Sequence, residues 1–426
     1  MSLRRREQGA PFDDRPWAIA LSNFRRSPVR VLFTTWSSGG HLAPMVPLAR
    51  AFLAAGHQVR VAVPSGCAAA VAHAGLVPVP VGPLPKASGA AGAVPRRIGN
   101  WPADWPVRPA GLGAEERGML RALGEKQVRI AEAMAQGLVA FARCWQPGLV
   151  VHDASAYAGT VAAAVLGVPA VGQMWGSAAV LRLDRQDLHG PPLPGYARLM
   201  RRYGVDPAYE PGLWLDPCPP SLALPSSARR MAVRFVPNGQ DGQGGPHGQD
   251  GPHGQDGPHG QGGQDGAPGE GKAAYRVCVA WDDPGGPPKP VRAALRHAET
   301  RGTEVVLWPG VAAGPPYRLP AGCRAVLHQG GGTAVVAAAA AGVPQLIVAP
   351  RPEQQLNGAR LALVGAGRLV PVDASPARLF AELSALLEQP SYAAAARELR
   401  GEVLSMPGPD EAVTRLVSPA QASHAP

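Results

Sequence analysis

The chain has 426 residues, of which 17% are charged, and its formal net charge is +10. This length suits two domains of ordinary size, each with its own hydrophobic core. The arginines are scattered and form no basic stripe interleaved with aromatic residues, which argues against nucleic-acid binding and leaves a general attraction for anionic ligands.

The N-terminus and the cysteines indicate where the protein works. Residues 1–28 contain no apolar run long enough for a secretion signal, and no later segment reaches the ~18 uninterrupted apolar residues of a membrane span. We therefore expect a disordered extension over 1–28 and a soluble, cytoplasmic protein. The odd number and wide spacing of the cysteines favour reduced core thiols over a disulfide framework or a zinc site: Cys67, Cys144, Cys218, Cys278 and Cys323.

The N-terminal half alternates between short apolar strands and helices. We predict strands at 30–36, 58–63, 77–81, 149–152 and 169–173, and helices at 42–55, 118–144 and 158–166. This alternation predicts a parallel sheet with right-handed crossovers. Residues 83–115 are rich in Gly, Pro and Trp, so we expect a long surface loop there.

The composition changes abruptly between residues 239 and 271. Three near-perfect copies of GPHGQD follow one another in a tract of Gly, Gln and Asp without aliphatic residues. Such a tract buries too little apolar surface to offset its ordering entropy, so we predict a flexible linker. Its periodic histidines, His247, His253 and His259, leave weak metal binding as an alternative to a plain spacer. Beyond the linker the alternation restarts, with strands at 276–280 and 304–308.

Two residues at strand ends are candidates for acid–base chemistry. His41 follows two glycines where the first strand turns into the first helix, and Asp153 ends the strand LVVHD. Ligands of open α/β sheets bind at the carboxyl ends of the strands. An imidazole suits a general base for a hydroxyl, and a carboxylate would orient it. The structural alternatives are a helix cap or core position for His41 and an N-cap for Asp153.

A second motif, HQGGGTAVVAAAAAGVPQLIVAPRPEQQLN, spans His328 to Asn357. An apolar strand runs into three glycines and an alanine-rich helix, a pattern that favours an anion site of backbone N–H groups at a helix N-terminus. An ordinary strand–turn–helix contact is the alternative. The candidate residues of this site are His328, Gly330, Gly331, Gly332, Thr333, Glu353 and Gln354.

Together these motifs resemble the UDP-glycosyltransferase-like family, and in particular its actinomycete branch that attaches deoxysugars to macrolides and aromatic polyketides. RVLFTTWSSGGHLAP is similar to the family's opening strand and helix, and QPGLVVHDASAYAG to the segment with its partner aspartate. The resemblance implies an α/β protein with the GT-B fold, in which two Rossmann-like domains with parallel sheets face each other across a cleft. It also implies that His41 activates the acceptor with Asp153 as its partner.

On the donor side, the resemblance implies that His328, the three glycines and Thr333 hold a diphosphate, and that Glu353 and Gln354 hold the sugar. GEVLSMPGPDEAVTRL is similar to the family's C-terminal helix, which crosses back to the first domain. We therefore predict five segments: a disordered extension (1–28), an acceptor-binding domain (29–237), the linker (238–273), a nucleotide-sugar-binding domain (274–405), and the crossing helix with its tail (406–426).

The chain departs from the family on the donor side. The glycine loop is one residue short, and Trp281-Asp282-Asp283 stands where the family has a Gly-Thr-Ser-like phosphate turn. Only nineteen residues separate Trp308 from His328, where the family has a longer segment against the nucleotide base. Glu353 replaces an aspartate, and the run to it from Pro350 is one residue short. By this comparison, the acceptor-binding motifs of the family are intact, whereas its donor-binding motifs are shortened or altered.

The leading hypothesis is a metal-independent, inverting glycosyltransferase of secondary metabolism. By resemblance, the co-substrate is a TDP- or UDP-linked deoxyhexose, the acceptor is a hydroxyl of a polyketide-like aglycone, and no cofactor is needed. A homodimer or an activator protein remains open as a partner. The alternative hypothesis is a catalytically impaired homologue that binds the aglycone or activates a partner.

Overall fold

The computed structural model describes residues 28–36, 39–83, 101–237, 275–281, 283, 285–308 and 318–417. The predicted linker and, apart from Pro28, the predicted N-terminal extension lie outside these residues, so both stay predictions. Within the described ranges, no helix has the length and apolar character needed to cross a membrane.

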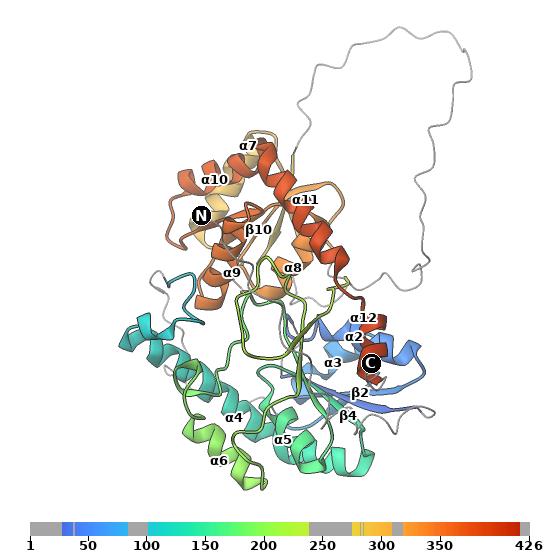
Figure 1. The fold of residues 1–426 in the computed structure, drawn as a ribbon. Helices are drawn as coiled ribbons and strands as arrows, with labels where there is room; N and C mark the ends of the chain where they lie inside the picture. Colours follow the sequence, from blue (N-terminus) through green and yellow to red (C-terminus); the bar gives the residue numbers. More distant parts are fainter. Residues whose placement is uncertain are drawn as a thin grey trace, which may run out of the picture.

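Two parallel sheets organise the chain, one in each half (Figure 1). The first has the order β3-β2-β1-β4-β5-β6-β7 and the second β12-β11-β10-β8-β9, and neighbouring strands are parallel throughout. The strands are β1 (Arg30–Thr34), β2 (Gln58–Val63), β3 (Pro78–Pro80), β4 (Leu149–Asp153), β5 (Ala170–Gln173), β6 (Leu213–Asp216), β7 (Arg230–Ala232), β8 (Arg276–Ala280), β9 (Glu304–Leu307), β10 (Cys323–His328), β11 (Gln345–Val348) and β12 (Gly367–Val370). The predicted α/β architecture with two parallel sheets is confirmed.

Helices cover the faces of both sheets, as the crossovers between parallel strands require (Figure 1). In the first half they are α2 (Met45–Ala54), α3 (Ala68–His73), α4 (Ala114–Trp145), α5 (Tyr157–Leu166) and α6 (Pro194–Arg202). In the second half they are α7 (Lys289–Thr300), α8 (Gly332–Ala341), α9 (Pro352–Leu363), α10 (Pro376–Glu388), α11 (Pro390–Ser405) and α12 (Pro409–Val417).

The first strand shows why the first sheet is buried on both faces. Side chains alternate along a strand, so Val31 and Phe33 pack into one core cluster, which includes residues of α2, and Leu32 packs into another with α4 and α5. Both faces of a crossover-connected sheet need apolar residues, which explains why β1 reads as a continuous apolar run.

The last helix returns to the first half of the molecule. α11 belongs to the second half, and α12, which follows it, lies beside α2 (Figure 1). Ala412, Val413 and Leu416 of α12 are buried in the same core cluster as α2. The C-terminal residues therefore stabilise the N-terminal sheet.

Residues 101–115 of the predicted surface loop are mostly exposed, as predicted, but two tryptophans among them are buried. Trp101 and Trp105 are buried, with ring centroids 5.0 Å apart, in a cluster that also contains Ile347 and Leu356 of the second half. The Trp101 N–H donates to Gln355 Oε1 at 3.2 Å. The prediction is wrong for these two tryptophans because their burial removes a large apolar area from water, which outweighs the local preference of Gly and Pro for exposed loops.

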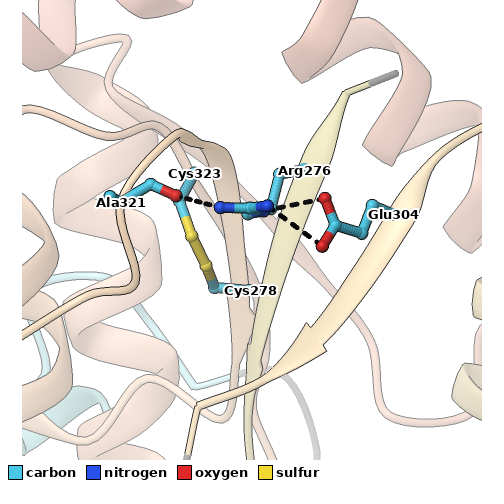
Figure 2. Close-up of a disulfide and its surroundings, with 5 residues drawn as sticks. All are labelled: Arg276, Cys278, Glu304, Ala321 and Cys323. Carbon is cyan, nitrogen blue, oxygen red and sulfur yellow. Dashed lines mark hydrogen bonds and ion pairs between the residues drawn. A yellow bond between two sulfur atoms is a disulfide. The ribbon is translucent and has the colours of Figure 1, made fainter.

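Two of the cysteines are paired. Figure 2 shows the Cys278–Cys323 disulfide between β8 and β10, beside an ion pair of Arg276 with Glu304 on β9. The prediction that all five cysteines are reduced is wrong for this pair, whereas Cys67, Cys144 and Cys218 are free thiols. Cys278 and Cys323 are 45 residues apart in sequence, and only the sheet order, which makes β8 and β10 neighbours, brings their Cα atoms to 6.1 Å.

Candidate active site

A cleft of about 960 Å³ lies between the two halves of the molecule. Its N-terminal wall contains His41 and three tryptophans, Trp36, Trp105 and Trp175. Its C-terminal wall includes Trp281, Asp283, Arg351 and Glu353. A concave site with aromatic walls and a few polar groups is the usual form of a small-molecule site.

The structure brings His41 and Asp153 together. His41 Nδ1 lies 2.5 Å from Asp153 Oδ2, which also accepts a hydrogen bond from the Thr35 hydroxyl at 3.2 Å. The other carboxylate oxygen accepts two hydrogen bonds from Ser155, from its backbone N–H at 2.7 Å and its hydroxyl at 2.6 Å. Asp153 is not the N-cap of α5, which is Ala156, so its carboxylate is free to orient His41.

The electrostatics of this pair favour a basic imidazole. Burial alone would lower the pKa of His41, but the charge and hydrogen bond of Asp153, assisted by Glu353, outweigh it and raise this pKa. Burial likewise opposes ionisation of Asp153, yet its interactions with His41 and Ser155 lower the pKa of the carboxyl. Both shifts have the same main cause, the partly buried ionic hydrogen bond between the two side chains.

Trp175 connects this pair to Glu353, a predicted sugar-binding residue. The Trp175 ring packs on the His41 ring with centroids 4.4 Å apart, and its indole N–H donates to Glu353 Oε1 at 2.7 Å. Burial raises the pKa of Glu353, although this hydrogen bond and the charge of His41 oppose the rise. Trp175 therefore contacts both His41, the predicted base, and Glu353, the predicted sugar-binding residue.

The other predicted donor residues lie away from the cleft wall. His328 is buried; its Nε2 lies 2.9 Å from Gln345 Oε1 and its Nδ1 accepts the Gly330 N–H at 3.0 Å. Burial lowers the pKa of His328 to about 4, so the imidazole is neutral at physiological pH and holds the glycine loop. Gln354 is also buried, and among the described residues its Oε1 has no hydrogen-bond partner.

The N-terminus of α8 meets the first half of the molecule directly. The Thr333 hydroxyl lies within hydrogen-bond distance of the Gly40 carbonyl, at 2.6 Å, and of the Trp175 carbonyl, at 3.0 Å. A Cβ on Gly332 would lie 2.6 Å from the carbonyl carbon of Gly176, so only glycine fits there. At Gly331, by contrast, a Cβ would meet nothing within 4 Å, and φ is −58°. Gly331 is thus the residue of the helix start with free space beside it.

Sequence reasoning missed several residues of the cleft. Trp175 follows β5 and His41 follows β1, and the two meet because only β4 lies between these strands in the sheet. Lys126 of α4 and Arg351 before α9 also line the cleft, and no motif marked either of them. Position at a strand's carboxyl end was an available signal for Trp175. In the described part of the chain, no cluster of three or more His, Cys, Asp or Glu side chains is arranged to hold a metal ion.

Two domains of one family match this chain. The N-terminal domain described as "Erythromycin biosynthesis protein CIII-like" matches residues 50–242, and the corresponding C-terminal domain matches residues 311–418. An aclacinomycin-T 2-deoxy-L-fucose transferase from Streptomyces galilaeus is 30% identical over 91% of this chain and 95% of its own length. The chain belongs to this family. It is a glycosyltransferase, as the resemblance of its motifs implied.

Two further relatives agree with this assignment. An erythronolide mycarosyltransferase from Saccharopolyspora erythraea is 29% identical over 91% of this chain and 98% of its own length. The glycosyltransferase SsfS6 from Streptomyces sp. SF2575, solved with thymidine diphosphate, superimposes with a TM-score of 0.68 at 25% identity, covering 92% of this chain and all of SsfS6. These matches confirm the GT-B fold.

Proposed function

We propose that this protein transfers a deoxyhexose from thymidine diphosphate to a hydroxyl of a polyketide aglycone, with inversion at the anomeric carbon. One observation carries the proposal. His41 is hydrogen-bonded to Asp153 and packs against Trp175, which donates a hydrogen bond to Glu353. These contacts lie in a cleft that both halves of the molecule line. The relatives named above are sugar transferases of polyketide biosynthesis by their names, which supports the same substrate class.

The His41 imidazole would act through Nε2, because Nδ1 is engaged by Asp153. Nε2 takes the proton of the acceptor hydroxyl as its oxygen attacks the anomeric carbon from the face opposite the nucleotide. The bond to the diphosphate oxygen breaks, and the negative charge leaves on thymidine diphosphate. Asp153 holds the imidazolium that forms, while Glu353 accepts hydrogen bonds from the sugar hydroxyls once it separates from Trp175.

The diphosphate needs positive partners. The first-turn N–H groups of an α-helix lack intrahelical acceptors and attract anions, so we place the diphosphate beside Gly331 at the start of α8. Arg351, on the cleft wall next to Glu353, supplies a second positive group. The roles of His328, Gly330, Gly332, Thr333 and Gln354 remain predictions; in this arrangement they hold the loop and the contact between the two halves.

Two measurements test the proposal. Calorimetric titration with thymidine diphosphate should show saturable binding to the wild type. His41→Ala should keep this binding and lose about 10²–10⁴-fold in turnover of a TDP-deoxyhexose with a polyketide aglycone, the usual contribution of a general base. Unchanged turnover would exclude His41 as the base.

One observation favours the second candidate function, an impaired homologue that only binds the aglycone. The N-terminus of α8, where the diphosphate is expected, is covered by Gly40, Trp175 and Gly176. If the two halves do not separate there, thymidine diphosphate cannot reach Gly332 or Thr333. A wild type that binds the aglycone but shows no binding of thymidine diphosphate at millimolar concentration would establish this second function.

A further inference from the structure

The N-terminal wall of the cleft, as the described residues form it, carries a cation that the proposed mechanism does not use. Lys126, on α4, lines the cleft together with Trp36 and His41. Its Nζ lies 5.5 Å from the centroid of the Trp36 ring. The Trp36 indole is itself held, because its N–H donates to the Ser155 hydroxyl at 2.8 Å. Lys126 itself is exposed, and its ammonium group lies against this held ring on the same wall of the cleft as His41.

In the described part of the chain, this cation has no neutralising carboxylate. Among the described residues, no carboxylate forms an ion pair with Lys126, whereas Arg182 and Arg230 are each paired with an aspartate. Burial, and then the nearby guanidinium groups of Arg351 and Arg129, lower the pKa of Lys126. An ammonium group next to other cations in a partly desolvated cleft attracts an anionic ligand.

The surroundings of Lys126 indicate the shape of that ligand. Trp36, Trp105 and Trp175 line the same cleft, together with Leu120 and Leu123 of the helix that carries Lys126. Flat aromatic rings stack on indoles, and aliphatic side chains tolerate no unpaired charge. A planar polycyclic molecule with one acidic oxygen at its edge fits these walls, because its rings pack against the aromatic wall, of which Trp36 is the more accessible part, while the oxygen meets the ammonium group.

We propose that Lys126 binds an ionised phenolic or enolic oxygen of an aromatic polyketide, and so selects acceptors that carry such an oxygen beside the reacting hydroxyl. This inference rests on the proposed function and narrows its acceptor class from polyketides in general to acidic aromatic ones.

Acceptor binding would also act on the base. The positive charge of Lys126 opposes the rise in the pKa of His41. Among the described residues, the other titratable groups that line the cleft are Asp283, Arg351 and Glu353. A bound phenolate cancels the field of Lys126 at His41, so the imidazole becomes a stronger base when an acceptor of this class is in place.

The test compares two probes that differ only in the acidic oxygen. 1,2-Dihydroxyanthraquinone and its 2-methyl ether, which blocks only the more acidic hydroxyl, are titrated into the full-length protein at a pH above the first pKa of the phenol, and quenching of tryptophan fluorescence reports binding. The wild type should bind the phenol about tenfold or more tightly than the ether, as a charge-assisted hydrogen bond provides. Lys126→Met should reduce the ratio to about one, and Lys126→Arg should retain the preference.

Arg121→Met is the matched control, because it removes one positive charge from an exposed position on the same helix outside the cleft wall. It should leave the ratio as in the wild type. Equal wild-type affinity for both probes, an unchanged ratio in Lys126→Met, or a wild type that binds neither probe would overturn the inference. The proposed function is judged separately, by thymidine diphosphate binding and sugar transfer, so a transferase without phenol selectivity is a distinguishable result.

Discussion

Asp153 lies behind His41 and touches no part of the cleft that a substrate would occupy. Its carboxylate is buried and accepts hydrogen bonds from Thr35 and Ser155 in addition to its contact with His41. Three fixed partners hold one carboxylate in one orientation, which is the condition for a group that positions a base. Asp153 is thus a positioning residue, and its effect should be measurable as a change in the pKa of His41.

Asp153→Asn should shift the acid limb of the pH profile of turnover to lower pH. Asp153 raises the pKa of His41 against the opposing effect of burial, so an amide leaves burial dominant and lowers that pKa. His41 then stays neutral at lower pH, but the imidazolium formed during reaction loses its counter-charge and the maximal rate falls. Steady-state rates across the pH range measure both effects.

Asp206→Asn serves as the control, since Asp206 is exposed and its side chain accepts only the Ala208 N–H among the described contacts. It should reproduce the wild-type profile. An acid limb that stays in place in Asp153→Asn would mean that a group other than His41 sets the lower pH limit.

At the scale of elements, the glycine loop shows that a local sequence pattern predicts a turn but not the distant residues that the turn contacts. Three glycines between a buried strand and an alanine-rich run predicted the β10–α8 turn, and the structure has it. The pattern could not show that Gly332 lies against Gly176 or that Thr333 bonds to Gly40, because these partners are 156 and 293 positions away. Local preferences define an element, whereas distant contacts decide which of its faces stays open.

The two neighbouring glycines should respond differently to a side chain. Gly331→Val should leave stability nearly unchanged, because φ is −58° and a Cβ there meets nothing within 4 Å, but should abolish binding of thymidine diphosphate by filling that space. Gly332→Ala should lower the free energy of unfolding by about 1–3 kcal/mol, since its Cβ would overlap the backbone at Gly176 and Ser177.

Urea denaturation and calorimetric titration of both variants provide these values. Gly66→Ala is a suitable reference, because a Cβ there also meets nothing within 4 Å and the residue does not line the cleft. Full affinity for thymidine diphosphate in Gly331→Val would move the diphosphate site away from the start of α8.

At the scale of the whole molecule, sequence reasoning succeeded where apolar periodicity was strong and failed where the fold joins distant segments. The helix predicted at 118–144 is α4, from Ala114 to Trp145, because a long amphipathic pattern needs no further information. The Cys278–Cys323 pair and the burial of Trp101 depend on the sheet order and on contact between the two halves. Neither is encoded in a local window of residues.

The return of α12 to the first half is a property of the whole molecule. A substitution of Leu416 tests whether this helix stabilises the N-terminal core. Leu416 is 1% exposed and packs in the core cluster that contains α2, so Leu416→Ala should lower the free energy of unfolding by about 2–5 kcal/mol. Leu363→Ala, at a residue that is 69% exposed, should change it by no more than about 0.5 kcal/mol. Tryptophan fluorescence during urea denaturation reports mainly on the N-terminal half, where seven of the nine tryptophans lie. Equal stability of the two variants would show that α12 contributes nothing to the N-terminal core.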